Sequence, residues 1–147
     1  MKFLLKVFVV LLMGVGLTAC SGIIPSTIGQ FAECPSKPNC VSSKSVISDH
    51  KISPLGYNGS TDNARDSLLR LIKSMPRAKI VSEKESLIHV EFTSEIFRFV
   101  DDVEFYFEDP GIIHFRSASR LGHSDLGVNR ERMENIRQLF EYNLMGR

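Results

Sequence analysis

Apolar and polar residues alternate over most of residues 79–117 in this 147-residue chain. Successive side chains of a β-strand point to opposite faces of the sheet, so this alternation indicates strands with one buried and one polar face. Phe105 and Phe115 fall on the apolar face, whereas Glu104 and Arg116 fall on the polar one. The predicted strands are residues 79–83, 87–93 with a possible extension to 99, 102–108 and 112–117.

Two amphipathic helices are predicted on either side of these strands. The first, residues 61–75, has apolar residues at helical spacing and Pro76 as its stop. The second, residues 128–144, carries Ile136 and Phe140 on one apolar stripe. These elements predict an α+β two-layer sandwich in the order α-β-β-β-β-α, with an antiparallel sheet of about four strands and both helices on one face.

The turn at residues 108–111 sets the pairing of the last two strands. If Phe107 and Ile113 share the apolar face, a plain two-residue Pro-Gly turn breaks the alternation. A three-residue loop or a bulge, with Gly111 at positive φ, is therefore predicted. The opposed pairs are then Phe105 with Phe115, Tyr106 with His114, and Glu104 with Arg116.

The N-terminal segment has the layout of a secretory signal. Two lysines precede an apolar run that glycines keep shorter than the roughly 20 residues a membrane-spanning helix needs. Leu-Thr-Ala-Cys at residues 17–20 resembles the lipobox of bacterial lipoproteins, in which the chain is cut before a cysteine that receives lipid. This predicts a signal peptide over residues 1–19 and a lipidated Cys20 followed by a tether to residue 33. Ser21 after the cysteine indicates an outer-membrane destination.

The two remaining cysteines are Cys34 and Cys40. Disulfides persist in the oxidising compartments that export implies, so a disulfide between them is predicted. A metal site would need more Cys or His, and a redox pair usually has two intervening residues rather than five. We expect the disulfide to pin an irregular segment over residues 34–59, within a single domain of residues 34–147. The apolar tether, residues 21–33, is expected to lie on the domain or on lipid headgroups.

The charge pattern argues against a nucleic-acid partner. The chain has 18 Lys+Arg and 17 Asp+Glu, and loss of residues 1–19 with their two lysines turns a net charge of +1 into −1. Nucleic-acid-binding proteins present a concentrated basic surface. Here charges of both signs are interspersed, and no nucleic acid is expected to bind.

Four arginines gather around the start of the second helix: Arg116, Arg120, Arg130 and Arg132. Two fall in its first turn, where the backbone amides already carry partial positive charge, so anions are needed nearby. The preferred interpretation is a clamp of internal carboxylates that fixes the helix on the sheet. The alternative is a bound phosphate or carboxylate ligand. The candidate clamp or anion-binding residues are Arg98, Asp101, Asp102, Glu104, Arg116, Ser119, Arg120, Asp125, Asn129 and Arg130.

Other chemistry-bearing residues indicate no catalytic site. His123, Ser124 and Asp125 are adjacent in sequence, so they cannot align as base, nucleophile and orienter. His89 and His114 lack dense ligand spacing and would suit a metal only as cross-strand neighbours. No catalytic residue, metal or cofactor is predicted.

Three stretches, CPSKPNCVSS, EFTSEIFRFVDDVEF and FRSASRLGHSDLGVNRERMENIR, resemble an uncharacterised family catalogued as domain of unknown function 1499. The resemblance extends from about Cys34 to the last helix. It implies a small exported or organellar domain of bacteria and plant plastids, with no activity that can be carried over.

The expected protein is a lipoprotein of the bacterial cell envelope, anchored on the periplasmic face of the outer membrane. Its domain is expected to have a non-catalytic, binding or structural role. The expected partners are the membrane, through the anchor, and a small anion or an envelope protein. The alternative is an anion-binding domain or a hydrolase-like enzyme in which Asp101 or Asp102 acts with Arg116 and Arg120.

Overall fold

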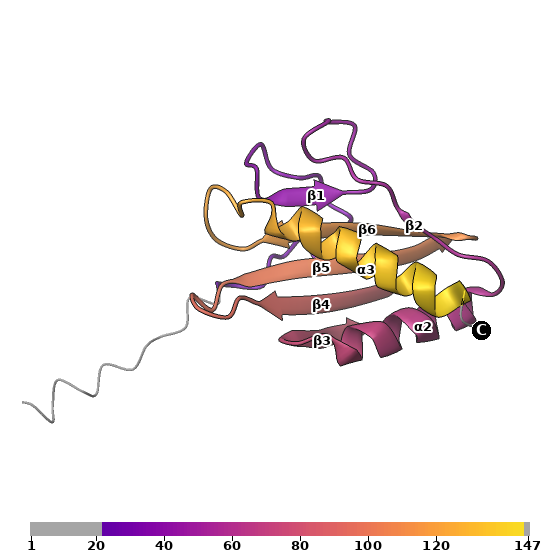
Figure 1. The fold of residues 1–147 in the computed structure, drawn as a ribbon. Helices are drawn as coiled ribbons and strands as arrows, with labels where there is room; N and C mark the ends of the chain where they lie inside the picture. The colour runs from indigo at the N-terminus through magenta and orange to yellow at the C-terminus, as the bar shows by residue number, and fades with distance from the viewer. Residues whose placement is uncertain (1–21, 146–147) are drawn as a thin grey trace, which may run out of the picture.

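The computed structural model describes residues 22–145 and has two layers, an open antiparallel sheet and two helices on one of its faces (Figure 1). The elements are β1 (Cys40–Ser42), β2 (Leu55–Gly56), α2 (Thr61–Ser74), β3 (Ala78–Glu83), β4 (Leu87–Thr93), β5 (Val100–Asp109), β6 (Ile112–Ser119) and α3 (Val128–Met145). The strand order is β1-β6-β5-β4-β3, and β2 also pairs with β6. The predicted α+β sandwich is confirmed, whereas the predicted signal peptide and Cys20 lie outside the described residues.

The sheet has six strands rather than about four. The two additional strands, β1 and β2, lie within residues 34–59, which the sequence predicts to be irregular. Both pair with β6, with Cys40 opposite Ala118 and Leu55 opposite Ile113. Strands of three and two residues are too short for alternation to be visible in the sequence, and tertiary pairing defines them.

β4 ends at Thr93 and does not extend to residue 99. Residues 94–99 form the loop that joins β4 to the antiparallel β5. The Ser94 amide donates to the Phe99 carbonyl at 2.8 Å, and the Phe99 amide donates to Ser94 Oγ at 2.9 Å. Arg98 has a left-handed φ of 57°, which reverses the chain inside this loop.

The core lies between the two helices and the apolar face of the sheet. Helix α2 is capped by Ser60, whose side chain accepts a hydrogen bond from the Asn63 amide. Neither helix within residues 22–145 is long and apolar enough to cross a membrane. The fully buried core side chains include Leu68, Ile72, Met133, Ile136 and Phe140 from the helices, and Ile88, Val90, Val103, Phe105, Ile113 and Phe115 from the strands.

The β5–β6 hairpin contains a bulge, one of the two predicted alternatives. Tyr106 pairs with His114, but Asp109 pairs with Ile112, so β5 contains one more residue than β6 between the two pairs. Gly111 in the turn has a φ of 78°. The bulge preserves the alternation, and the pairs Phe105–Phe115, Tyr106–His114 and Glu104–Arg116 are confirmed.

The second face of the sheet, opposite the helices, is covered by the N-terminal segment of residues 22–33. The Gly29 amide donates to the Glu104 carboxylate at 2.7 Å, and the Phe31 amide donates to the Tyr106 hydroxyl at 2.9 Å. The Phe31 ring meets the Tyr106 ring edge-on, with centroids 4.4 Å apart. In Figure 1 this indigo segment passes behind the sheet. The described part of the tether therefore lies on the domain.

Candidate functional site

The polar residues singled out by the sequence form two networks, one on each face of the sheet. Asp101 and Asp102 separate in this way because neighbouring residues of a strand point to opposite faces. The helix-side network consists of Asn39, Asp101, Ser117, Ser119, Asp125, Asn129 and Arg132. The second-face network consists of His89, Glu91, Asp102, Glu104, Tyr106, Arg116 and Arg120.

Arg120 is at the centre of the second-face network. Its Nε and Nη2 atoms each donate to the Asp102 carboxylate at 2.7 Å, in a bidentate arrangement. Nη2 also lies 2.5 Å from Glu91 Oε1. Asp102 is 1% exposed and also bonds His89 Nε2 at 2.7 Å. Two carboxylates on neighbouring strands therefore hold the guanidinium of the residue that follows β6.

The two carboxylates that contact Arg120 are held in their charged forms. Burial by itself raises the pKa of Asp102, but hydrogen bonds from Arg120 and His89 outweigh burial and leave that pKa lowered. The pKa of Glu91 is also lowered, because the attraction of Arg120 and Lys79 outweighs burial. The hydrogen bond with Asp102, followed by that with Glu91, raises the pKa of Arg120 despite burial. This arrangement is a satisfied ion-pair cluster.

Glu104 is fully buried between the sheet and the N-terminal segment. Its Oε2 accepts from the Gly29 amide and from the Tyr106 hydroxyl, and its Oε1 lies 3.5 Å from Arg116 Nη1. Burial, and then the hydrogen bond to Glu104, raise the pKa of Tyr106, so its hydroxyl remains a donor. Arg116 Nε is buried without a hydrogen-bond partner within residues 22–145. The carboxylate of Glu104 thus joins β5, β6 and the N-terminal segment.

Replacing Glu104 with glutamine is expected to loosen the N-terminal segment on the sheet. The amides of Gly29 and Phe31 should exchange with solvent deuterium roughly fivefold faster, because a charged acceptor contributes about 1 kcal/mol more than a neutral one. Hydrogen exchange followed by mass spectrometry measures this change. The control is Glu108→Gln, since Glu108 forms an exposed pair with Lys44. Equal exchange in Glu104→Gln and the native chain would show that the carboxylate does not hold the segment.

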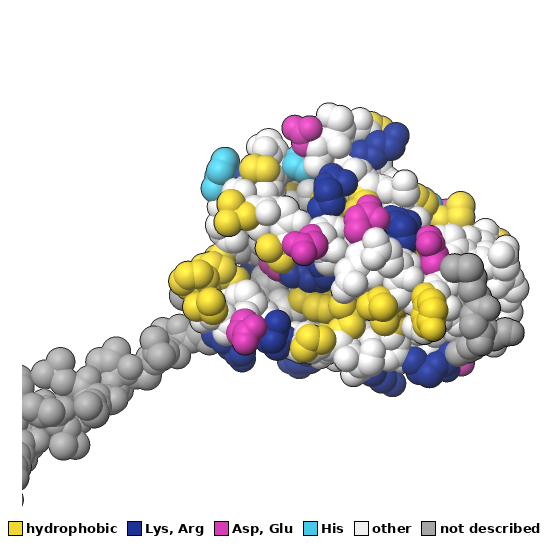
Figure 2. All heavy atoms as spheres, viewed as in Figure 1, with side chains coloured by type: hydrophobic (Ala, Val, Ile, Leu, Met, Phe, Trp, Pro, Cys, Tyr) yellow, Lys and Arg dark blue, Asp and Glu magenta, His cyan; other side chains and the backbone are white. Residues whose placement is uncertain are grey.

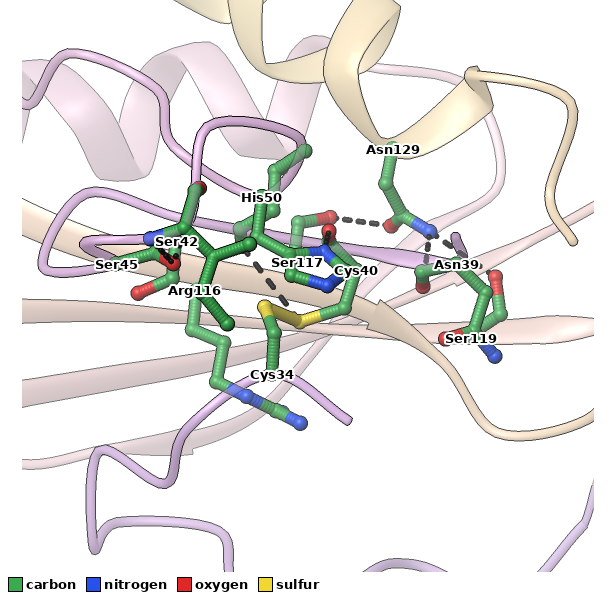
Figure 3. The surroundings of a disulfide bond; sticks show 12 residues. Cys34, Asn39, Cys40, Ser42, Ser45, His50, Arg116, Ser117, Ser119 and Asn129 are labelled. Atoms are coloured by element: carbon green, nitrogen blue, oxygen red, sulfur yellow. Dashed lines mark hydrogen bonds between the residues drawn. A yellow bond between two sulfur atoms is a disulfide. The ribbon is translucent and has the colours of Figure 1, made fainter. Parts of the chain in front are cut away.

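The predicted disulfide between Cys34 and Cys40 is confirmed (Figure 3). Cys40 is buried at the start of β1, and Cys34 directly follows the N-terminal segment. The bond therefore attaches that segment to the edge of the sheet at β1. Figure 3 shows Cys34 and the Arg116 side chain on the side of the strands away from the helix that carries Asn129.

Asn129 is the centre of the helix-side network. It is fully buried, and its Oδ1 accepts from Ser117 Oγ at 2.5 Å and from Arg132 Nη1 at 2.8 Å. Its Nδ2 donates to the Asn39 carbonyl at 3.2 Å and to Ser119 Oγ at 3.0 Å. Figure 3 shows this side chain reaching from α3 toward the residues beside β1 and on β6. One amide therefore fixes the start of α3 to the sheet.

Arg132 forms the ionic part of this attachment. Its Nη2 lies 2.5 Å from Asp101 Oδ2, and its guanidinium lies over the Phe92 ring, 4.8 Å from the centroid. Asp101 lies on β5 and Phe92 on β4, so the first turn of α3 is held to two neighbouring strands. An ion pair and a cation–π contact thus attach the first turn of α3 to the sheet.

Asp125 supplies the anion at the start of α3. Its Oδ2 accepts from the Asn129 amide at 2.9 Å, and its Oδ1 accepts from the Gly127 amide at 3.0 Å. A carboxylate at this position satisfies backbone donors and complements the helix dipole. The N-terminus of α3 is therefore capped from within the chain.

Two candidate residues do not pair with carboxylates. Arg130 was expected to do so, but it donates to the backbone carbonyls of Lys51 and Asp49 at 3.0 and 2.9 Å. The reason is helical geometry: residues two apart are rotated by about 200° around the axis. Arg130 therefore faces away from the carboxylate that Arg132 contacts. Arg98 lies exposed in the 94–99 loop and forms no ion pair with any residue from 22 to 145.

A groove near these networks lies between α3, the end of α2 and β4. It has a volume of about 610 Å³, and its lining includes Arg77, Phe92, Arg132 and Gln138. Figure 2 shows this hollow between apolar and charged side chains. Arg132 is already bonded to Asp101, so the groove offers a neutralised arginine rather than an unpaired one.

The other candidates considered from the sequence form no reactive group. His89 and His114 are not neighbours, because β5 lies between their strands and pairs them with Glu104 and Tyr106 respectively. Within the described part of the chain, no three His, Cys, Asp or Glu side chains could hold a metal ion. Ser124 accepts from the Leu126 amide and belongs to the turn before α3.

Sequence reasoning missed four participants in the networks, Glu91, Tyr106, Ser117 and Asn39. The signal for Glu91 and Tyr106 was present, because alternation places both on the polar face of their strands. Glu91 lies opposite Asp102 across β4 and β5, where it can share Arg120. Asn39 carries no such signal, since it acts through its backbone carbonyl.

The fold and these networks define a small disulfide-bonded α+β domain without an assigned activity. The sequence profile described as "Protein of unknown function (DUF1499)" matches residues 30–140, and the chain belongs to that family. No curated protein matches the sequence with significance.

Proposed function

We propose that the protein is a lipid-anchored lipoprotein of the bacterial cell envelope, facing the periplasm from the outer membrane, with a non-catalytic domain. The support for the anchor is the Leu-Thr-Ala-Cys sequence at residues 17–20, and Ser21 supports the outer-membrane destination. The Cys34–Cys40 disulfide agrees with export, since disulfides persist in oxidising compartments.

The position of Gly22 is the observation that carries this proposal. A Cβ at Gly22 would lie 3.1 Å from Arg120 Cβ, so the chain already passes close over the domain at this point. Cys20 is two residues earlier, and two residues span about 7 Å at most. Lipid on Cys20 would therefore hold the domain directly at the bilayer surface, and several acyl chains together make such an anchor stable.

The non-catalytic role is supported by the carboxylates that a hydrolase would need. Asp101 and Asp102 are buried, and each is bonded to an arginine within 2.7 Å. A general acid or base must reach a substrate proton, and these carboxylates instead hold structural elements together. Arg120 and Arg132 are engaged in the same pairs, which argues against both the hydrolase and the anion-binding alternative.

Replacing Cys20 with serine is expected to release the protein from the membrane fraction, because a serine hydroxyl does not take the thioether-linked lipid. Intact-mass analysis of the native membrane fraction should give a chain that starts at Cys20 and carries acyl groups. Ser26→Ala, an exposed change in the tether, should leave both results unchanged. A native chain that begins at Met1 without lipid would contradict the proposal.

A further inference from the structure

The loop between β4 and β5 carries three large apolar side chains that are exposed to solvent. Ile96 is 80% exposed, Phe97 69% and Phe99 43%. The rings of Phe97 and Phe99 stack with centroids 5.6 Å apart, so the three residues form one apolar tip. Figure 2 shows hydrophobic side chains gathered at this end of the molecule. Contiguous exposed apolar groups mark interaction sites.

The described chain begins beside this tip. Gly22 lies against Arg120 and Leu121, and the Arg120 amide donates to the Val100 carbonyl, one residue after the loop. Figure 1 shows the start of the described chain and the β4–β5 loop at the same end of the sheet. The next two residues along the chain, Ile23 and Ile24, are also exposed. An anchor on Cys20, about 7 Å of chain away at most, therefore emerges beside the apolar tip.

We propose that Ile96, Phe97 and Phe99 insert into the interface between the headgroups and acyl chains of the bilayer that holds the anchor. This inference rests on the proposed lipidation of Cys20. Aromatic side chains favour the membrane interface, and apolar side chains there add binding strength in proportion to the area they bury. Arg98, exposed between the two phenylalanines and without an ion pair within the described range, is placed to meet anionic headgroups.

Lipid fits the tip better than a protein partner because of where the tip lies. Two elements distant in sequence, the tether at Gly22 and the loop at 94–99, converge at one end of the sheet. An anchor at that end brings the tip to the bilayer without any further partner. The inserted tip gives the domain a second point of attachment, which fixes its orientation on the membrane.

A single tryptophan tests the proposal, since the chain contains none. The lipidated full-length variants Phe97→Trp and Tyr142→Trp are placed in vesicles of phosphatidylethanolamine and phosphatidylglycerol with brominated acyl chains. Tyr142, 73% exposed on the last turns of α3, lies at the opposite end of the domain and is the matched control. We expect strong quenching and a blue-shifted emission for F97W, and full intensity for Y142W.

Two outcomes separate this proposal from the proposed anchor. If intact mass shows acylation and the vesicles carry the protein, but F97W is no more quenched than Y142W, the tip does not enter the bilayer. If F97W shifts to the blue only when envelope proteins are added, the tip binds protein and the inference is overturned. Absence of acyl groups from the chain would instead reject the anchor.

Hydrogen exchange provides a measurement that needs no change in the tip. On vesicles, the amides of residues 94–99 in the native lipidated chain should exchange more slowly than in the Cys20→Ser variant in solution. The amides of residues 139–145, at the far end of α3, should exchange equally in both. Equal exchange of residues 94–99 would also overturn the proposal.

Discussion

Replacing Arg120 with alanine is expected to lower the free energy of unfolding by roughly 3–5 kcal/mol. The change leaves the carboxylates of Asp102 and Glu91, 1% and 13% exposed, without the cation that both contact. An uncompensated buried charge costs far more than a surface pair contributes, because neither carboxylate regains full hydration. Urea unfolding at neutral pH, followed by circular dichroism, measures the loss.

The matched control for this prediction is Arg77→Ala. Arg77 also pairs with a carboxylate, that of Glu95 at 3.6 Å, but both side chains are exposed. Its loss should cost less than about 1 kcal/mol. An Arg120→Ala variant as stable as the native protein, or a native unfolding midpoint that rises with added phosphate, would show that Arg120 awaits a ligand.

The effect of Arg120→Ala should also depend on pH. The pKa values of Asp102 and Glu91 in the folded protein lie below their ordinary values of 3.8 and 4.5. The contribution of these two carboxylates to the free energy of unfolding is therefore complete at pH values above their ordinary pKa values. It is lost as the pH falls through the lowered pKa values of the folded protein. The difference in unfolding free energy between the native and variant proteins should shrink below about pH 4.

Removal of the disulfide, by Cys34→Ser together with Cys40→Ser, is expected to lower the free energy of unfolding by about 2 kcal/mol. The sequence separation is only six, so the bond restricts a short loop of the unfolded chain. Changing both cysteines together avoids a free thiol in the variant. Thermal or urea unfolding of the two forms measures the difference.

Thiol labelling provides the complementary measurement for the disulfide. In protein isolated from its native source without reductant, alkylation without prior reduction should leave Cys34 and Cys40 unlabelled, and reduction should make both reactive. Complete labelling of both cysteines without reductant would contradict the disulfide. Metal analysis of the protein would then be the next measurement.

The sheet could be predicted because alternation with a period of two is a strong signal in long strands. It placed Phe105 opposite Phe115 and required a three-residue loop or a bulge near Gly111, and the pairing and a bulge are observed. Alternation could not predict β1 or β2, because strands of three and two residues are too short to show a period of two. Their conformation is set by β6, a partner more than 50 residues away in the chain.

The sequence predicted which residue types form the candidate site better than it predicted how these residues are arranged. The sequence indicates that arginines and carboxylates occur together, but it groups Asp101 with Asp102 as one cluster. Alternation places these neighbours on opposite faces, where Asp101 holds α3 and Asp102 holds Arg120. The role of Arg130 depends on the path of residues 49–51, which no local pattern encodes.

The covering of the second face by the N-terminal segment also determines an order of assembly. Gly29 and Phe31 leave the ribosome early, yet their partners Glu104 and Tyr106 follow 75 residues later. Contacts so distant in sequence form slowly, because a long loop must close before they contribute. These residues of the N-terminal segment are thus expected to be among the last to reach their native positions. Before the N-terminal segment docks, the carboxylate of Glu104 lacks the hydrogen bond from the Gly29 amide.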